Sequence, residues 1–187
     1  MTAGRAPLVI ITGPPGAGKT TLCRTFAAES DDGLHLESDL FYRFPGRPID
    51  PSLPASHAQN RAIVRALGAA AASFVSDGYR VYLDGIIGPW FLETLRGALT
   101  TVAENGQFEI DPFEIDYVVL DLPADEALAR VRARDGEDAT TAAGRMHAAF
   151  RDLGALATHR FPVTGLTLSR LGTEVGEGLD AGRFRLR

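Results

Sequence analysis

The stretch Gly13-Pro14-Pro15-Gly16-Ala17-Gly18-Lys19-Thr20 decides the fold of this chain. It matches G-x-x-x-x-G-K-[ST] at every fixed position, an apolar run (8–11) precedes it, and a segment of helical character (21–28) follows it. Strand, glycine-rich loop and helix form the context that a phosphate-binding loop requires. Its backbone N–H groups point into one concavity beside a helix N-terminus, so the stretch predicts a polyphosphate site.

Lys19 is the only lysine among the 19 Lys and Arg residues of the chain. We expect this compact charge to contact the β- and γ-phosphates of ATP and the Thr20 hydroxyl to bind Mg²⁺. The alternative is a Gly/Pro turn between a strand and a helix, without a ligand. The predicted nucleotide-binding residues of the loop are Gly13, Pro14, Pro15, Gly16, Ala17, Gly18, Lys19, Thr20 and Thr21.

Length and composition favour a soluble enzyme of one domain, residues 1–187. The hydrophobic content of 45% suffices for a core, and a net charge of −5 gives no electrostatic case for a nucleic-acid partner. No run approaches the ~20 apolar residues of a membrane span, and the N-terminal sequence lacks a signal-peptide pattern. We expect a cytoplasmic monomer or homodimer with no membrane partner.

Strand-like runs alternate with helical patterns, which predicts a parallel sheet built from βα units. The runs cover residues 8–12, 34–37, 80–83 and 117–122, with a weaker one near 161–164. Pro89 and Pro123 each open a predicted helix, and Gly78 and Gly136 each follow the end of one. The apolar positions of the predicted helices are Ile63, Leu67, Ala70, Phe74, Leu92, Leu95, Leu99, Leu128 and Val131.

A last long helix is predicted from apolar residues at helical spacing, which are Ala143, Met146, Phe150, Leu153 and Ala157. The Pro-rich stretch 43–51 cannot be regular structure, and the polar stretch 135–142 is typical of a lid tip. Residues 172–187 are interpreted as a short helix followed by a loose end.

Asp39 follows the second predicted strand, and ligands of an open parallel sheet bind beyond the carboxyl ends of its strands. A carboxylate there can accept a proton from a substrate hydroxyl. Glu37 is a weaker competitor for this role, and a helix N-cap is the alternative role for Asp39. Residues that could line the acceptor pocket are Tyr42, Arg43 and Arg47.

Asp84 ends the apolar third run and suits a carboxylate that holds Mg²⁺ through water. Asp121 is its rival, but it leads directly into a predicted helix and is better explained as a helix-start carboxylate. The apolar loop that follows Asp84 resembles a pocket wall. Trp90 and Phe91, after this loop, could stack a planar substrate or pack at a helix start.

Arg130 and Arg134 are four residues apart and therefore share one helix face, whereas Arg132 points away. We expect these two arginines, in a lid of about residues 130–150, to stabilise charge on the phosphates. The alternative is a solvated face paired with neighbouring acids, and Arg145 has less support as a further lid arginine. Scattered histidines, without cysteine partners, give no metal-ligand spacing.

These residues together resemble the adenylate kinase-like superfamily of small P-loop kinases, and more narrowly the chloramphenicol phosphotransferase-like, gluconate kinase-like and shikimate kinase-like group. The glycine loop, Ser38-Asp39, Leu83-Asp84-Gly85, and Leu120 to Pro123 followed by the two arginines carry the resemblance, over about residues 8–166. It implies a three-layer P-loop NTPase fold with a five-stranded parallel sheet, helices on both faces and a short arginine-bearing lid.

The resemblance also implies ATP with Mg²⁺, a base at Asp39 and an adenine-side loop at Thr164-Gly165-Leu166. After Asp84-Gly85 the sequence lacks the arginine of nucleotide monophosphate kinases, which argues for a partly apolar, hydroxyl-bearing acceptor. The predicted function is an ATP-dependent kinase of a small-molecule hydroxyl, such as an antibiotic or a sugar-like metabolite. Two alternatives stay open: a non-catalytic nucleotide-binding switch protein, and a toxin-like kinase of a nucleotide sugar.

Overall fold

The computed structural model describes residues 6–105 and 114–187, and its centre is a parallel five-stranded sheet in the order β2-β3-β1-β4-β5. The predicted domain, 1–187, also includes residues outside these ranges. The strands are β1 (Leu8–Thr12), β2 (Gly33–Glu37), β3 (Arg80–Asp84), β4 (Ile115–Asp121) and β5 (Arg160–Pro162). The helices are α1 (Lys19–Ala28), α2 (Ser38–Phe41), α3 (His57–Ser76), α4 (Pro89–Asn105), α5 (Ala124–Asp135), α6 (Ala139–Ala149) and α7 (Leu168–Asp180).

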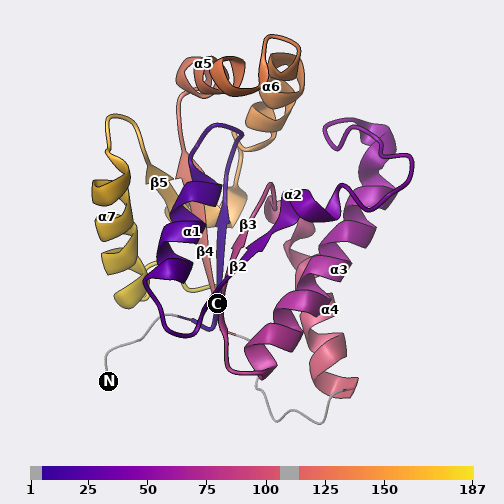
Figure 1. The fold of residues 1–187 in the computed structure, drawn as a ribbon, viewed down its shortest axis with the longest axis vertical. Helices are drawn as coiled ribbons and strands as arrows, with labels where there is room; N and C mark the ends of the chain where they lie inside the picture. Colours follow the sequence, from indigo (N-terminus) through magenta and orange to yellow (C-terminus); the bar gives the residue numbers. More distant parts are fainter. Residues whose placement is uncertain (1–5, 106–113) are drawn as a thin grey trace.

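The central strand β1 is buried along its whole length, which explains its unbroken apolar sequence. Its side chains alternate between two cores. Leu8 and Ile10 belong to the core that α3 and α4 cover, and Val9 and Ile11 to the core under α1 and α7. Figure 1 shows these two helical layers on opposite sides of the sheet. The predicted three-layer P-loop NTPase fold is therefore confirmed.

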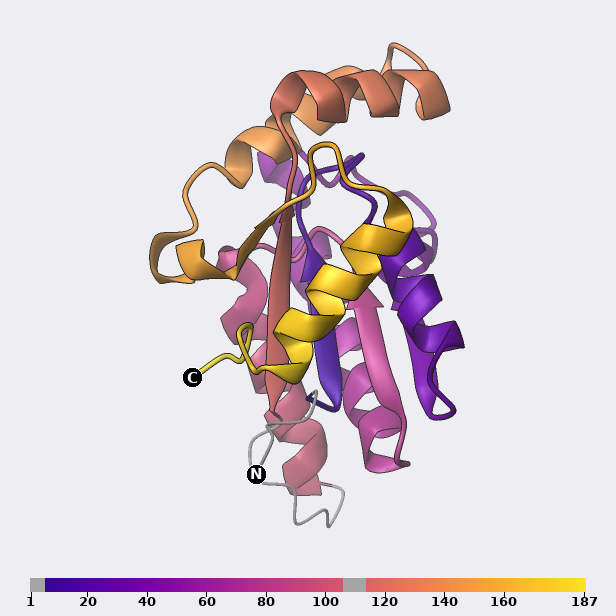
Figure 2. The ribbon, with the colours of Figure 1, turned by 90° about the vertical axis from the view of Figure 1, so that its left-hand side faces the viewer.

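Helices α5 and α6 leave this three-layer body and lie above the carboxyl ends of the strands (Figures 1 and 2). The chain rises from β4 into α5, turns at 136–138, and descends through α6 to β5. This places a helical cap over the end of the sheet where the glycine loop lies.

The predicted long helix through Ala157 is wrong in its extent, because α6 ends at Ala149. The Phe150 N–H bonds to the carbonyls of Ala148 and His147, which tightens the last turn, and the chain then heads back to the sheet. Phe150 and Leu153 are buried in the α3–α4 core from this irregular return segment. The helical spacing of Phe150 and Leu153 in the sequence therefore reflects their burial in the core, and it does not indicate a continuous helix.

The predicted polar lid tip, residues 135–142, is also shorter than expected. The turn between α5 and α6 spans 136–138, and the remaining residues of the stretch are helical. Asp135 closes α5, and Ala139 to Ala142 form the first turn of α6. The polar composition of residues 135–142 therefore reflects both the turn and the exposed start of α6.

The end of the chain is anchored, which corrects the expectation of a loose end. Helix α7 buries Leu171, Val175 and Leu179, and Phe184 after it is fully buried. Asp116 on β4 is fully buried and accepts hydrogen bonds from the Arg185 side chain (2.9 Å) and the Ala6 N–H (2.8 Å). One carboxylate thus joins both ends of the described chain to the sheet.

The other predicted strands and helices are confirmed to within about two residues at their ends. Within the described ranges, none of the helices combines the length and the hydropathy that crossing a bilayer requires.

We predict that Asp116→Ala lowers the free energy of unfolding by about 3 kcal/mol, because it removes the buried acceptor of two charge-assisted hydrogen bonds. Urea unfolding at pH 7 measures the change. The control is Asp31→Ala, which alters an exposed carboxylate and should change stability by less than about 0.5 kcal/mol. Equal effects of the two substitutions would show that the link at Asp116 contributes nothing specific.

Candidate active site

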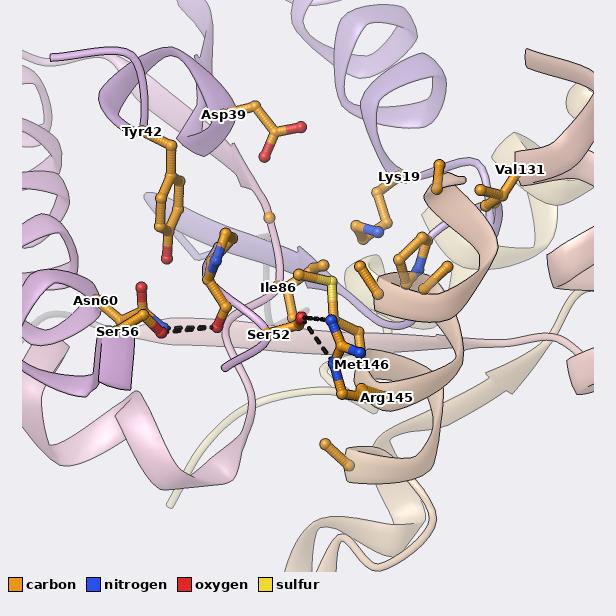
Figure 3. Close-up of a pocket in the computed structure, with 18 of the residues that line it drawn as sticks. Lys19, Asp39, Tyr42, Ser52, Ser56, Asn60, Ile86, Val131, Arg145 and Met146 are labelled. Carbon is orange, nitrogen blue, oxygen red and sulfur yellow. Dashed lines mark hydrogen bonds between the residues drawn. The ribbon is translucent and has the colours of Figure 1, made fainter. Parts of the chain in front are cut away.

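A cavity of about 940 Å³ opens between the carboxyl edge of the sheet and the α5–α6 cap. The glycine loop and the start of α1 form one end, which we call the donor half. The segment from Pro51 to Asn60, the loop after β3, and α6 form the other end, the acceptor half. Figure 3 shows Lys19 and Asp39 near the donor half, and Ser56 and Asn60 at the far end.

The glycine loop wraps around the N-terminus of α1, and Gly18 begins the helix in the left-handed region with a φ of 94°. Lys19 is only 9% exposed, and its Nζ donates a hydrogen bond to the Pro14 carbonyl at 3.0 Å. The ammonium thus contacts the backbone of its own glycine loop and lies inside the concavity in which the motif predicts phosphates to bind.

The lid is in contact with the glycine loop. The backbone of α5 approaches Gly16 so closely that a Cβ there would come within 2.7 Å of the Ala127 carbonyl oxygen. The Arg130 guanidinium donates a hydrogen bond of 3.3 Å to the Gly16 carbonyl. Any side chain at position 16 would push the lid away from the phosphate site.

Burial lowers the pKa of Lys19 from 10.5 to about 8, although the nearby carboxylates of Asp84 and Asp39 act in the opposite direction. The charged ammonium is therefore held in a site that solvates it poorly. A polyphosphate bound in the loop would supply the missing negative charge, which favours nucleotide binding on electrostatic grounds.

Asp84 ends β3 at the floor of the cavity and is 3% exposed. Its Oδ1 lies 3.3 Å from the His35 Nε2, but this buried oxygen has no hydrogen-bond partner among the described residues. A buried carboxylate oxygen without a partner fits a role in Mg²⁺ binding, together with the Thr20 hydroxyl, which lines the same cavity. Asp121, the sequence-based rival, instead pairs with Arg160 at 3.0 Å.

Magnesium commonly keeps several waters and takes only one or two protein carboxylates beside substrate phosphates. Among the described residues, no three His, Cys, Asp or Glu side chains gather into a metal cage. One carboxylate and one hydroxyl beside a phosphate loop suit Mg²⁺ bound together with a nucleotide better than a permanently bound metal.

Asp39 lies in the short helix α2, directly after β2, and lines the cavity opposite the glycine loop. Desolvation raises its pKa, the negative charges of Asp84 and Glu37 raise it further, and Lys19 and Arg134 lower it. Glu37 points elsewhere, because its carboxylate pairs with Arg24 at 2.9 Å. Of these two acids, Asp39 is the one in the cavity wall, with a raised pKa that suits a general base.

The loop after β3 is held in place by its neighbours on both sides. The Ile87 N–H donates to the Thr12 hydroxyl of β1 (3.0 Å), and the Tyr117 hydroxyl of β4 donates to the Ile87 carbonyl (2.8 Å). At Gly85 a Cβ would lie 2.2 Å from the Ser38 hydroxyl oxygen, so only glycine allows this approach to α2. These contacts set the distance between the β3 carboxylate and Asp39.

The structure separates the four lid arginines. Arg134 lines the cavity and pairs with Asp135, whereas Arg132 points away and pairs with Glu137. Arg130 contacts the glycine loop but lies outside the cavity wall. Arg145, on α6, reaches across the acceptor half, where it bonds to the Ser52 hydroxyl (2.8 Å) and pairs with Asp50 (3.0 Å).

Several residues of the acceptor half carried no signal in the sequence. Ser52, Ser56, His57 and Asn60 line the cavity, yet they belong to an irregular segment and the first turn of α3. Their positions depend on how the Pro-rich segment 43–51 folds back over α3. The Arg- and Pro-rich sequence of this segment predicted irregular structure, but it did not predict which side chains would line the cavity.

Other predicted site residues lie outside the cavity wall. Arg43 and Arg47 are exposed on the loop after α2, while Tyr42 beside them lines the cavity. Thr164 is exposed in the loop after β5, which rises at the same end of the sheet as the glycine loop (Figure 2). Its assignment to the adenine side stays a prediction. Both aromatic residues at the start of α4, Trp90 and Phe91, line the acceptor half.

A family model described as an AAA ATPase domain matches residues 1–165 of the chain. No curated protein matches it. Among solved structures, a gluconokinase from Sinorhizobium meliloti 1021 superposes with a TM-score of 0.65 at 17% identity, over 95% of this chain and 92% of that chain.

The Mycobacterium tuberculosis APS kinase CysC, in complex with AMPPNP and APS, gives a TM-score of 0.60 at 19% identity over 95% of this chain and 99% of its own. A shikimate kinase from Acinetobacter baumannii, in complex with shikimate, gives 0.52 at 18% identity over 91% and 90%. At these identities the likeness shows the fold, which is that of the small P-loop kinases.

We predict that Lys19→Met stabilises the nucleotide-free protein at pH 7 by on the order of 1–3 kcal/mol, since it removes a buried charge. The folded protein holds the Lys19 proton less tightly than the unfolded chain. The destabilisation caused by burying the charged ammonium is therefore fully present below pH 8. It disappears as the pH rises from about 8 towards 10.5. Urea unfolding of the wild type and of Lys19→Met between pH 7 and 10 measures the difference between their free energies of unfolding, which should become smaller as the pH rises.

The exposed Arg61→Met serves as the control and should show no such dependence on pH. A Lys19→Met protein less stable than the wild type at pH 7 would contradict the burial penalty.

Proposed function

This chain belongs to the AAA ATPase domain family, and we propose that it is an ATP-dependent kinase that phosphorylates a hydroxyl group of a small molecule in the cytoplasm. The observation that carries the proposal is the two-sided cavity. A phosphate loop with its lysine lies at one end, and Asp39 faces it from the neighbouring wall. A site that only binds a nucleotide has no need of the second half.

The solved structures of similar fold support the same reaction class. They are named gluconokinase, APS kinase and shikimate kinase, and the APS kinase structure contains AMPPNP. The acceptor differs among them while the fold persists, which agrees with substrate choice by the loops of the acceptor half.

In the proposed reaction the acceptor O–H gives its proton to the Asp39 carboxylate. The acceptor oxygen forms a bond to the γ-phosphorus as the bond from that phosphorus to the β–γ bridging oxygen breaks, and ADP leaves with the electron pair. Lys19 and the loop N–H groups bind the phosphates, and Arg134 compensates charge on the transferring group. Mg²⁺, held by Thr20 and Asp84, would neutralise phosphate charge.

The two alternatives make different demands on the site. A non-catalytic switch would bind ATP without consuming it in response to an acceptor. A toxin-like kinase of a nucleotide sugar would share every donor-side residue and differ only in the acceptor. Measuring ATP consumption against a panel of hydroxylated metabolites, antibiotics and nucleotide sugars separates the three. Bound ATP without consumption by any of them would favour the switch.

We predict that Asp39→Asn lowers kcat/KM for the responsive acceptor by about 10²–10⁴-fold, because the amide cannot accept the hydroxyl proton. ATP-induced thermal stabilisation should persist, since Asp39 lies across the cavity from the glycine loop and is not one of the residues proposed to bind the phosphates. The control is Glu37→Gln, whose side chain pairs with Arg24 outside the cavity and should retain activity within about threefold. Undiminished transfer by Asp39→Asn would remove this residue from the mechanism.

We predict that Arg134→Ala lowers kcat by about 10²–10³-fold with little change in the KM for ATP, because its charge acts mainly on the transferring group. The matched control is Arg132→Ala, two residues away on the outer face of the same helix, where Arg132 pairs with Glu137. Steady-state kinetics at saturating Mg²⁺ compares the two variants. Equal losses would place the effect in the stability of α5 and not in the site.

A further inference from the structure

The α5–α6 lid is connected to the sheet by two legs of the chain. Asp121, the last residue of β4, begins the entry leg, which continues through Leu122 into α5. Phe150 and Arg151 directly follow α6 and begin the exit leg, which returns to β5 (Figure 2). A change in the angle between the lid and the sheet therefore has to take place at these two legs.

Arg160, the first residue of β5, bonds to both legs. Its Nη1 donates a hydrogen bond to the Asp121 carboxylate of the entry leg at 3.0 Å. Its Nη2 donates to the carbonyls of Phe150 and Arg151 in the exit leg, at 2.6 and 2.8 Å. The N–H groups of a guanidinium diverge from a rigid plane, so this one side chain holds the two legs at a fixed separation.

A second contact also crosses from one leg to the other. The His147 Nε2, in the last turn of α6, lies 2.8 Å from the Leu122 carbonyl, and a carbonyl only accepts, so the ring nitrogen donates this hydrogen bond. Leu122 is buried in the core under α1 and α7, whereas Phe150 is buried in the core that α3 and α4 cover. We call Arg160, His147 and the groups to which they bond the lid clamp.

The lid clamp lies at the base of the helix that brings Arg134 into the cavity wall. Burial has the largest effect on the pKa of Lys19 and of Asp39, and the charge of Arg134 lowers both. Arg134 is therefore close to the phosphate site and to the proposed base. The exit leg reaches the acceptor half, where the Phe150 ring packs against Trp90 at 5.4 Å between ring centroids.

The length of α5 makes the position of Arg134 sensitive to the angle at the lid clamp. Arg134 is ten residues beyond Ala124, the first residue of α5, and this spacing corresponds to about 15 Å along the helix. A tilt of about 5° at the base would therefore displace Arg134 by about 1.3 Å. Misplacing a catalytic group by about 1 Å can lower a rate by about 10²-fold.

We propose that Arg160 is a positioning residue for phosphoryl transfer, because it joins the two legs of the lid and thereby fixes Arg134 in the cavity wall. Arg160 itself lies outside the cavity wall, so it acts through Arg134 and does not touch the reacting groups. This inference rests on the kinase reaction proposed above. The position of the lid can nevertheless be measured without a nucleotide or an acceptor.

Steady-state kinetics of Arg160→Met with the responsive acceptor tests the effect on the reaction. We expect kcat to fall by about 10–100-fold and the KM for ATP to change by less than about threefold, since the glycine loop stays intact. In an Arg134→Ala background the same substitution should lower kcat by less than about threefold, because the group that Arg160 positions is already absent. The matched control is Arg170→Met, which removes an ion-paired arginine from α7 and should retain kcat within about threefold.

Arg160→Lys is the second variant, in case Arg160→Met does not fold. It keeps a positive charge beside Asp121, but a single ammonium lacks the fork that reaches both legs. We therefore expect kcat of Arg160→Lys to fall by about 10-fold, again with little change in the KM for ATP.

The distance between two spin labels measures the position of the lid in the nucleotide-free protein. The labels are attached at Asp138→Cys, in the turn between α5 and α6, and at Asp31→Cys, between α1 and β2, and both positions are exposed. Cys23, the only native cysteine, is fully buried and stays unlabelled. In Arg160→Met, or in Arg160→Lys, the distance distribution should shift or broaden by about 2 Å.

An unchanged label distance in the Arg160 variants would overturn the proposal, and so would a loss of kcat that adds fully to the loss in Arg134→Ala. An equal loss in Arg170→Met would show that the effect is not specific to the lid. If Arg134→Ala stays fully active while Arg160→Met is impaired, Arg160 acts through another group and the proposal is wrong. The label distances need no reaction, so failure of every acceptor to stimulate ATP consumption would overturn the kinase and leave the distance result standing.

Discussion

The burial of one positive charge is the constraint on which the rest of the site depends. Lys19 is 9% exposed, its pKa is lowered to about 8, and its ammonium contacts the Pro14 carbonyl of its own loop. The N-terminus of α1 adds further positive potential at the same point. This buried positive charge lowers the stability of the nucleotide-free protein and favours the binding of a polyphosphate. A bound polyphosphate would therefore restore the stability that the buried charge removes.

The sheet order turns this loop into one half of a larger site. Strand β3 lies between β1 and β2, so the residues that follow all three strands meet at one edge. Asp84 and Asp39 reach the lysine from there, close enough to influence its pKa. The hydrogen bonds from the Ile87 N–H to Thr12 and from the Tyr117 hydroxyl to the Ile87 carbonyl then hold the wall of the acceptor half against the same edge. The geometry follows from parallel pairing and does not depend on one long loop.

Sequence patterns correctly predicted the elements that a local motif or a hydrophobic period specifies. The glycine loop, the buried strands and the helix starts at Pro89 and Pro123 each have a period or a motif, and the structure has them within two residues. The patterns failed where burial and helical spacing coincided by chance, as at Phe150 and Leu153, which pack on the core from an irregular segment. They also missed Asn60 as a residue of the cavity wall, because its position there depends on a loop folded across the first turn of α3.

The sequence by itself determined the fold and the donor half, because a phosphate loop is built from consecutive backbone atoms and needs only a strand before it and a helix after it. Tertiary structure alone decided the acceptor half. It distinguished Arg134 in the cavity wall from Arg132 on the outer face and turned Glu37 away to Arg24. It also placed Asn60 in the cavity wall, with its side-chain amide bonded to the Pro51 carbonyl and the Ser56 hydroxyl. These outcomes depend on side chains from distant segments that meet only when the lid, the sheet edge and α3 pack together.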